Sequence, residues 1–316
     1  MNNPPAVRLH TLLGDYPLTL ALKRGDVRSP QVEFDFADVK TVHTAFKRTV
    51  RDLEFDASEL AIVTFLMAKA YGAPLVLVPA VITGRFQHPY IGYNPARGVL
   101  APGDLAGRRV GVRSYSVTTV AWLRGILMQD YGLGIDRVHW VTFEDSHIAE
   151  YRDPPTAERA PPGKDLLNML LAGEIDAAIF AEPVTDPRLK PLFPDPAAAA
   201  RDWYKRNGVV QINHMLVVKD TLSKSNPQAV AEVFRLLSRA SARPACPQRP
   251  GSTPIRWASR PSGPASRWPS ITSTGSASFR AASPSMNSST RRRGRLIFSA
   301  GRRPPDFLIS DCTREK

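Results

Sequence analysis

Polar side chains gather where a strand-like run passes into a helix-like run near the middle of the chain. The run "RRVGVRS" is strand-like, and a helical pattern extends from the following residues to position 131. A helix start presents unpaired backbone N–H groups and the positive end of a dipole, so it favours an anion. A guanidinium and a phenol just before it would add donors. The sequence therefore predicts a carboxylate cradle at Arg113, Tyr115, Ser116, Thr118 and Thr119. In a purely structural alternative, Ser116 is only an N-cap and the two threonines are surface residues.

A second group of candidates combines a basic side chain with two histidines. In "GRFQHPY", residues 84–90, Arg85 could pair with the other acidic group of a dianionic ligand. His88 could move a proton, because imidazole titrates near neutral pH. Taken alone, both would be ordinary exposed loop residues. His214 lies inside the strand-like "QINHML", where it is either a hydrogen-bonded core histidine or a site histidine.

Two carboxylates and one indole complete the candidates. Glu59 is expected to open a helix at "SELA", where a first-turn Glu is also favoured by the helix dipole alone. Glu182 ends the strand-like "IDAAIFAE", and strand ends in open α/β sheets point into the ligand crevice. Either carboxylate could bond ligand hydroxyls. Trp122 is expected in the core rather than on a ring-stacking surface.

Other chemistries have no support in the sequence. The segment "GDLAGRRVG" lacks both the Lys-Ser/Thr end of a P-loop and the spacing of a dinucleotide fingerprint. No cluster of His, Asp and Glu has metal-ligand spacing. We predict no metal and no organic cofactor. The remaining histidines have no informative context: His10, His43, His139 and His147.

The charge distribution argues against nucleic acid as a partner. Of the formal +13, residues 241–316 carry a net +11 and residues 1–240 only +2. Both cysteines, Cys246 and Cys312, also lie in the tail, which excludes a disulfide framework from the body. No apolar run approaches the roughly 18 residues of a membrane span. The first residues do not resemble a secretory signal, so we expect a cytoplasmic location.

The segment from residue 241 onward differs in texture from the rest of the chain. It is rich in Ser, Pro and Arg and has almost no apolar periodicity, which is typical of a disordered basic tail. A sharper hypothesis is translation out of frame. Moved by two bases, the codons from Gly251 can be read as a string with helical periodicity that includes "LGVE" and "RRFTVDELF". Some steps are forced, since Trp257–Ala258 must yield Gly and Met286–Asn287 must yield Glu.

Strand-like and helix-like runs alternate through residues 6–240. This alternation predicts an α/β fold with mostly parallel sheets. The expected strands are "VRLHTLL", "VEFDFADV", "APLVLVPAVI", "RRVGVRS", "RVHWVTF" and "IDAAIFAE". The expected helices span residues 42–51, 58–71, 116–131, 164–172 and 227–240.

Several motifs in the same order carry a family resemblance. The segments "APGDLAGRRVGVRSYSVTT" and "LLAGEIDAAIFAEP" resemble the second lobe of type 2 periplasmic-binding-protein folds. More narrowly, "EFDASELAIVTFLMAK", "PAVITGRFQHPYIGYN" and "NHMLVVKD" resemble the 4,5-dihydroxyphthalate decarboxylase family, many members of which are described as substrate-binding proteins. The resemblance implies two α/β lobes with a ligand cleft between them. Lobe one would comprise residues 1–83, completed by 212–240, and lobe two residues 84–211, with crossings at "LVLVPAVITG" and "VVQINHMLVV".

The resemblance also implies decarboxylation of an aromatic dicarboxylate without a cofactor. The barrier is the charge left on the ring as CO2 departs, which a general acid and fixed donors would lower. Arg113, Ser116, Thr118 and Thr119 would then anchor a carboxylate with help from Arg85. Either His88 or His214 would transfer the proton.

Two other functions remain open at this point. The same cleft could belong to a substrate-binding protein of an ABC transporter, or to a sensor, that captures a small anionic solute and catalyses nothing. A nucleic-acid-binding tail is supported by charge alone. The sequence leaves a homo-oligomer open. If closing helices of lobe one are missing, exposed apolar surface would reduce solubility.

Overall fold

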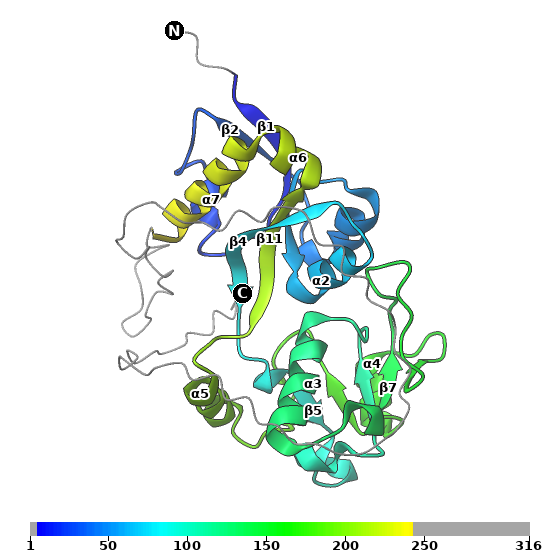
Figure 1. The fold of residues 1–316 in the computed structure, drawn as a ribbon. Coiled ribbons are helices and arrows are strands. Elements are labelled where there is room, and N and C mark those ends of the chain that lie inside the picture. The colour runs from blue at the N-terminus through cyan, green and yellow to red at the C-terminus, as the bar shows by residue number, and fades with distance from the viewer. Residues whose placement is uncertain (1–4, 243–316) are drawn as a thin grey trace, which may run out of the picture. The chain divides into compact units, whose positions relative to one another are not determined.

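Two β-sheets form the framework of residues 5–242, the part of the chain that the computed structural model describes (Figure 1). These residues belong to one compact unit. Residues 243–316, to which the hypotheses of disorder and of a shifted reading frame apply, lie outside the described residues. Residues 241 and 242, which were assigned to the tail, lie in the last turn of a helix.

The first sheet has the strand order β2-β1-β3-β11-β4 and forms the centre of the first lobe. Its strands are β1 (Val7–Leu12), β2 (Val32–Phe36), β3 (Ala57–Ala61), β4 (Leu75–Gly84) and β11 (Ile212–Lys219). Its helices are α1 (Leu20–Lys23), α2 (Ile62–Ala70), α6 (Asp220–Ser225) and α7 (Pro227–Ala242), with a 3-10 turn η1 (Val42–Ala45) and a π-helical turn η2 (Arg48–Asp52).

The second sheet has the order β10-β5-β9-β6-β7-β8 and forms the centre of the second lobe. Its strands are β5 (Ile91–Tyr93), β6 (Arg109–Val112), β7 (His139–Thr142), β8 (Ala157–Arg159), β9 (Ala177–Ile179) and β10 (Lys190–Pro191). Its helices are α3 (Thr118–Tyr131), α4 (Leu166–Ala172) and α5 (Pro196–Asn207). Four 3-10 turns accompany them: η3 (His88–Tyr90), η4 (Pro95–Arg97), η5 (Pro102–Leu105) and η6 (Ile135–Arg137).

The α/β class predicted from the sequence is confirmed, but both sheets are mixed rather than mostly parallel. The pairs β1–β2, β1–β3, β6–β7, β6–β9 and β7–β8 are parallel. The antiparallel pairs involve β4 and β11 in the first sheet, and β5 and β10 at one edge of the second. These antiparallel strands arise because the chain leaves the first sheet through β4 and returns to it through β11.

Strands β4 and β11 lie side by side and connect the two lobes (Figure 1). The connection is tied by buried amide groups just beyond the strands. The backbone N–H of Gln87 donates to Gln211 Oε1 at 2.7 Å, and the N–H of Arg85 donates to the Gln211 carbonyl at 3.0 Å. The predicted lobe limits at residues 83 and 211 fall at these crossings, and the division into domains stays a prediction.

One predicted helix in the first lobe proved to be a strand followed by a helix. Residues 58–71 were expected to be helical throughout, but Ala57–Ala61 form β3 and only Ile62–Ala70 form α2. Every residue of β3 is buried, because the strand lies between β1 and β11. Tertiary packing on both edges and faces thus overrides the local helical pattern.

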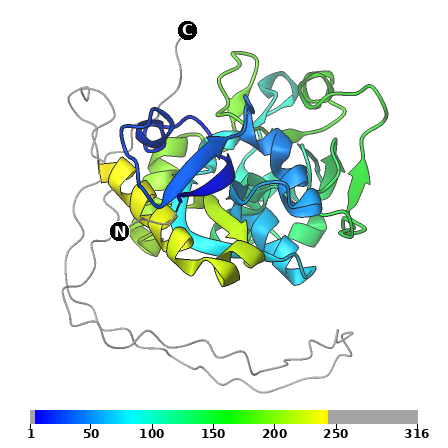
Figure 2. The same ribbon diagram turned by 90° about the horizontal axis from the view of Figure 1, so that it is seen from above.

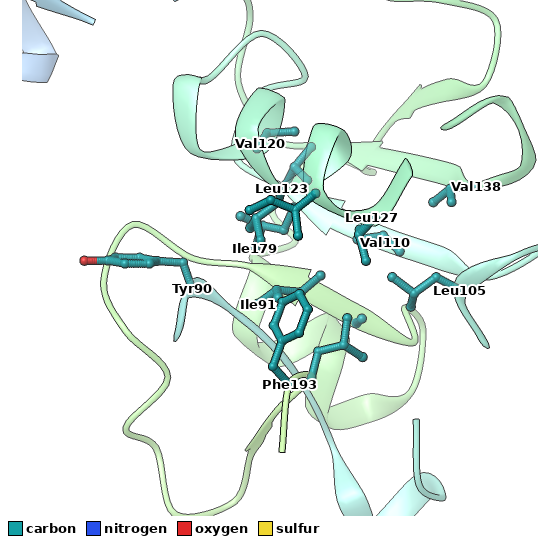
Figure 3. Packing of buried hydrophobic residues seen from close by; sticks show 14 of the residues in the cluster. Tyr90, Ile91, Leu105, Val110, Val120, Leu123, Leu127, Val138, Ile179 and Phe193 are labelled. Carbon is teal, nitrogen blue, oxygen red and sulfur yellow. The ribbon is translucent and has the colours of Figure 1, made fainter. Parts of the chain in front are cut away.

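The second lobe is held by an apolar stripe on α3. Val120, Leu123 and Leu127 recur at helical spacing and pack over Val110 of β6 and Ile179 of β9 (Figure 3). The helix begins two residues later than predicted and ends at Tyr131, where it is capped by Gly132, whose φ of 64° favours glycine.

In the first lobe, α7 lies alongside the strands, where Figure 2 shows it in yellow. Val233, Leu236 and Leu237 of α7 pack with Leu9 of β1 and Val78 of β4.

Truncating this apolar face should destabilise the protein. Leu236→Ala is expected to lower the free energy of unfolding by about 2–5 kcal/mol, because it removes buried methyl groups and leaves a cavity. Phe234→Ala is the matched control on the same helix, since Phe234 is 37% exposed and should change the free energy by about 0.5 kcal/mol or less. Urea denaturation of both variants measures the difference, and equal losses would contradict this packing.

Candidate functional site: a carboxylate-held histidine beside two helix starts

Glu59 is a fully buried carboxylate at the centre of β3, with 0% exposure. Its Oε2 accepts the backbone N–H of Gly14 at 2.9 Å, and its Oε1 accepts the hydroxyl of Tyr16 at 2.8 Å. Nδ1 of His214 lies 2.6 Å from the same Oε1. The prediction of a first-turn helical Glu was wrong, because the residue lies on a strand. Protein donors surround both oxygens, so the structure gives Glu59 the role of holding His214.

His214 lies on β11, next to β3 in the sheet. A carboxylate can only accept, so Nδ1 of the imidazole carries a proton and donates it to Glu59. The other nitrogen, Nε2, lies 3.3 Å from Asn213 Nδ2. With a side chain 15% exposed, His214 is neither sealed in the core nor free on the surface. This arrangement fixes the ring orientation and leaves Nε2 as the nitrogen that can exchange a proton.

The Tyr16 hydroxyl stabilises the same carboxylate. Burial, followed by the charge of Glu59, raises the pKa of Tyr16 well above its usual value. The phenol therefore remains protonated and acts as a donor. The charge of Arg85 opposes this rise in the pKa of Tyr16.

A second histidine of the site, His147, was not recognised from the sequence. It lies in the loop after β7, and its Nδ1 is 2.9 Å from Thr64 Oγ1 on α2 of the first lobe. The rings of His147 and His214 both contact Phe46 edge-on, at 5.6 and 5.2 Å between centroids. The position of His147 after a strand end of the second sheet is the only sequence signal that could have indicated it.

Positive charge is concentrated around these rings. Burial, followed by the charges of Arg113 and Lys47, lowers the pKa of His147 to about 3. Burial and then Arg113 also lower the pKa of His43, a further histidine that the sequence did not single out. Arg113 donates to Glu144 at 3.1 Å. The guanidinium predicted to anchor an anion therefore acts on the imidazoles of His147 and His43.

The starts of α2 and α3 meet at the same place. Oγ1 of Thr118 accepts the backbone N–H of Val63, in the first turn of α2, at 3.2 Å. Ser116 donates to Ser146 Oγ at 3.1 Å, while the N-cap of α3 is Val117. The structural alternative for this segment was therefore wrong: Ser116 is not the N-cap, and Thr118 and Thr119 are buried. Two positive dipole ends close together favour a bound anion.

The other ligand-binding candidates, Tyr115, Glu182 and Arg85, have different surroundings. Tyr115 packs into the core of the second lobe, against Trp140 and under the guanidinium of Arg124. Glu182 is exposed after β9. Arg85 donates to the Ala181 carbonyl at 3.2 Å and lies over the Tyr90 ring.

Trp122 packs against the core of the second lobe, as predicted. Its indole N–H donates to the Ile212 carbonyl at 2.8 Å, which links α3 to β11 two residues before His214.

His88 is separated from the other site residues. It is 1% exposed rather than an exposed loop residue, and its ring contacts Phe193 edge-on. It borders a hollow of about 390 Å³ whose other walls are Gln129, Asp130, Tyr131, Ala199, Asp202 and Arg206. Its Nδ1 has no hydrogen-bond partner within residues 5–242. Burial lowers the pKa of His88 to about 4. Of the two histidines proposed for proton transfer, the geometry favours His214.

Among residues 5–242, no three His, Cys, Asp or Glu side chains are grouped so that they could hold a metal ion. No helix in this described part of the chain is both long and apolar enough to cross a membrane.

Comparison with known proteins identifies the family. The chain is 30% identical over 240 residues to a 4,5-dihydroxyphthalate decarboxylase from Comamonas testosteroni, covering 70% of this chain and 71% of that one. It is 29% identical over 212 residues to the enzyme of the same name from Pseudomonas putida, covering 63% and 82%. No family model matches the chain. The chain belongs to the 4,5-dihydroxyphthalate decarboxylase family, as its motifs indicated.

Solved structures with a similar course of the chain include periplasmic binding proteins. The aliphatic sulphonate binding protein SsuA from Escherichia coli has a TM-score of 0.49 and 15% identity, over 75% of this chain and 73% of that one. The alkanesulfonate-binding protein SsuA from Xanthomonas axonopodis pv. citri, bound to MOPS, has a TM-score of 0.47 and 15% identity, over 77% and 75%.

The bond from Tyr16 to Glu59 should contribute measurably to stability. Tyr16→Phe leaves the buried carboxylate without one of its donors and is expected to lower the free energy of unfolding by about 1.5–3 kcal/mol. Tyr71→Phe is the control, because Tyr71 is 49% exposed. Urea denaturation measures both, and equal stability of the two variants would contradict the role given to Tyr16.

The buried neutral ring of His88 predicts a pH dependence of stability. The unfolded chain binds a proton near pH 6.5, whereas the folded ring does so only near pH 4, so His88 should reduce stability as the pH falls between these values. The contribution to the slope is at most about 1.4 kcal/mol per pH unit. His88→Gln should flatten the profile from urea melts at several pH values, and the exposed-site control His139→Gln should not. Parallel profiles for wild type and His88→Gln would contradict the prediction.

Proposed function

We propose that this chain is a decarboxylase that releases CO2 from an aromatic dicarboxylate resembling 4,5-dihydroxyphthalate. The observation that carries the proposal is the carboxylate-held imidazole of His214 in a chain of this family. The positive groups nearby suit a dianionic substrate. A cytoplasmic site of action is part of the same proposal.

The substrate carboxylate that is retained would bind at the start of α3. Thr118 and Thr119 lie in the first turn of this helix, and Ser116 and Arg113 lie just before it. Backbone N–H groups, hydroxyls and a guanidinium provide a charge-assisted set of donors. Arg85, whose charge acts on Tyr16, would assist from the crossing between the lobes.

His214 would supply the proton that replaces the departing carboxylate. Protonated His214 gives its Nε2 proton to the ring carbon that bears the departing carboxylate. The C–C bond then breaks, its electron pair stays with the benzene ring and CO2 leaves, and the imidazole recovers a proton from solvent. Glu59, 2.6 Å from Nδ1, balances the charge of the imidazolium and keeps the ring oriented.

The proposal is tested by measuring CO2 release from 4,5-dihydroxyphthalate. His214→Gln should lower kcat by about 10²–10⁴-fold, the usual contribution of a general acid. Arg113→Gln should mainly raise KM, by about 10–100-fold, because it removes a charge-assisted contact to the substrate. The control His139→Gln should match the wild type.

The contrary outcome is equally clear. A folded protein that releases no CO2 yet melts at a higher temperature with the acid would be a binding protein rather than an enzyme. The chain as printed is assayed beside a version whose tail is read in the shifted frame, so that a defect of the tail is not mistaken for a different function.

A further inference from the structure

We propose that His147 is a second catalytic residue of this site: its Nε2 takes the proton of the ring hydroxyl para to the departing carboxylate while His214 protonates the ring carbon. This inference rests on the proposed function and deepens it. Two proton transfers at opposite ends of one benzene ring need two groups on opposite sides of the ligand.

The two imidazoles share one aromatic neighbour, Phe46. Both stand edge-on to Phe46, with interplanar angles of 88° for His147 and 86° for His214. They come from different sheets, so their separation is set by how the lobes meet. Thr64 occupies Nδ1 of His147, as Glu59 occupies Nδ1 of His214. The hydrogen bond to Thr64 engages Nδ1 of His147, so the proposed step uses the other ring nitrogen, Nε2.

The loop that carries His147 is held from both lobes. Arg51 of the first lobe donates from Nε to the His147 carbonyl at 2.8 Å and from Nη2 to the Ser146 carbonyl at 2.9 Å. Ser146 Oγ accepts from Ser116 of the second lobe and from its own loop at Ile148 N. Thr64 and Arg51 are therefore positioning residues, and the pair of histidines is assembled when the lobes are together.

The charge state of His147 suits this step. Its lowered pKa keeps the imidazole neutral across the physiological range, with a nitrogen lone pair available. A weak base is sufficient, because a ring hydroxyl becomes strongly acidic once the ring carbon para to it has been protonated. Glu59 lies beside His214, and a neighbouring carboxylate favours the protonated imidazole that an acid needs. Cations lie near His147, and they favour the neutral imidazole that a base needs.

The proton balance closes without a further reactant. His214 protonates the carbon that bears the carboxylate, and the hydroxyl proton passes to His147. The C–C bond then breaks, and its electron pair restores the aromatic ring. His147 returns its proton to the oxygen, and His214 recovers one from solvent, so one solvent proton is consumed for each CO2 released.

The test compares His147→Gln with His139→Gln, using CO2 release as the assay. His147→Gln should lower kcat by about 10²–10⁴-fold. KM should change by less than about threefold, since the residue is not asked to bind the retained carboxylate. Thr64→Val should lower kcat about tenfold by releasing the ring, and Thr64→Ser should restore it, because the hydroxyl alone holds Nδ1.

Each result decides the question. If wild-type protein releases CO2 and His147→Gln matches His139→Gln, the role of His147 is overturned while the decarboxylase stands. If wild-type protein releases no CO2, the proposed function and this inference fall together. Should His147→Gln fail to fold by circular dichroism, the Thr64→Val and Thr64→Ser pair decides: equal kcat values for the two would overturn the inference.

Discussion

The buried carboxylate of Glu59 is the constraint on which the site depends. An ionisable group at 0% exposure is costly unless its oxygens are satisfied. Two segments meet that need: the turn with Gly14 and Tyr16, and β11 with His214. These segments are far apart in the chain but adjacent around the first sheet. The cost of leaving Glu59 unpaired therefore fixes both the local fold and the orientation of the His214 imidazole.

The two histidines near Phe46 have neighbours of opposite charge. One imidazole faces a carboxylate, and the other is surrounded by Arg113, Lys47 and Arg51. The starts of α2 and α3 add two positive dipole ends. Positive charge of this kind favours an anionic ligand. Burial, with these cations as a second cause, lowers the pKa of His147 and keeps its imidazole neutral.

Much of the fold could be predicted because it depends on local patterns. The stripe Val120, Leu123 and Leu127 has helical spacing, and it forms the buried face of α3. The runs around β1, β4, β6 and β9 are strands, as their β-branched residues indicated. Prediction failed at residues 57–61, where burial between two neighbouring strands makes a strand of a helix-like segment. It also failed for the parallel character of the sheets, since strand direction depends on where the crossings lead.

The sequence by itself determined the α/β class, the family, the polar start of α3 and the alternative that His214 is either a core or a site residue. These follow from residue type and short-range spacing, which act within one element. Only the tertiary structure decided that Glu59 holds His214, that His88 lies apart beside its own hollow, and that His147 joins the site. The physical reason is that hydrogen bonds such as His214–Glu59 and His147–Thr64 join residues 155 and 83 positions apart, and no local pattern encodes which distant groups must satisfy one another.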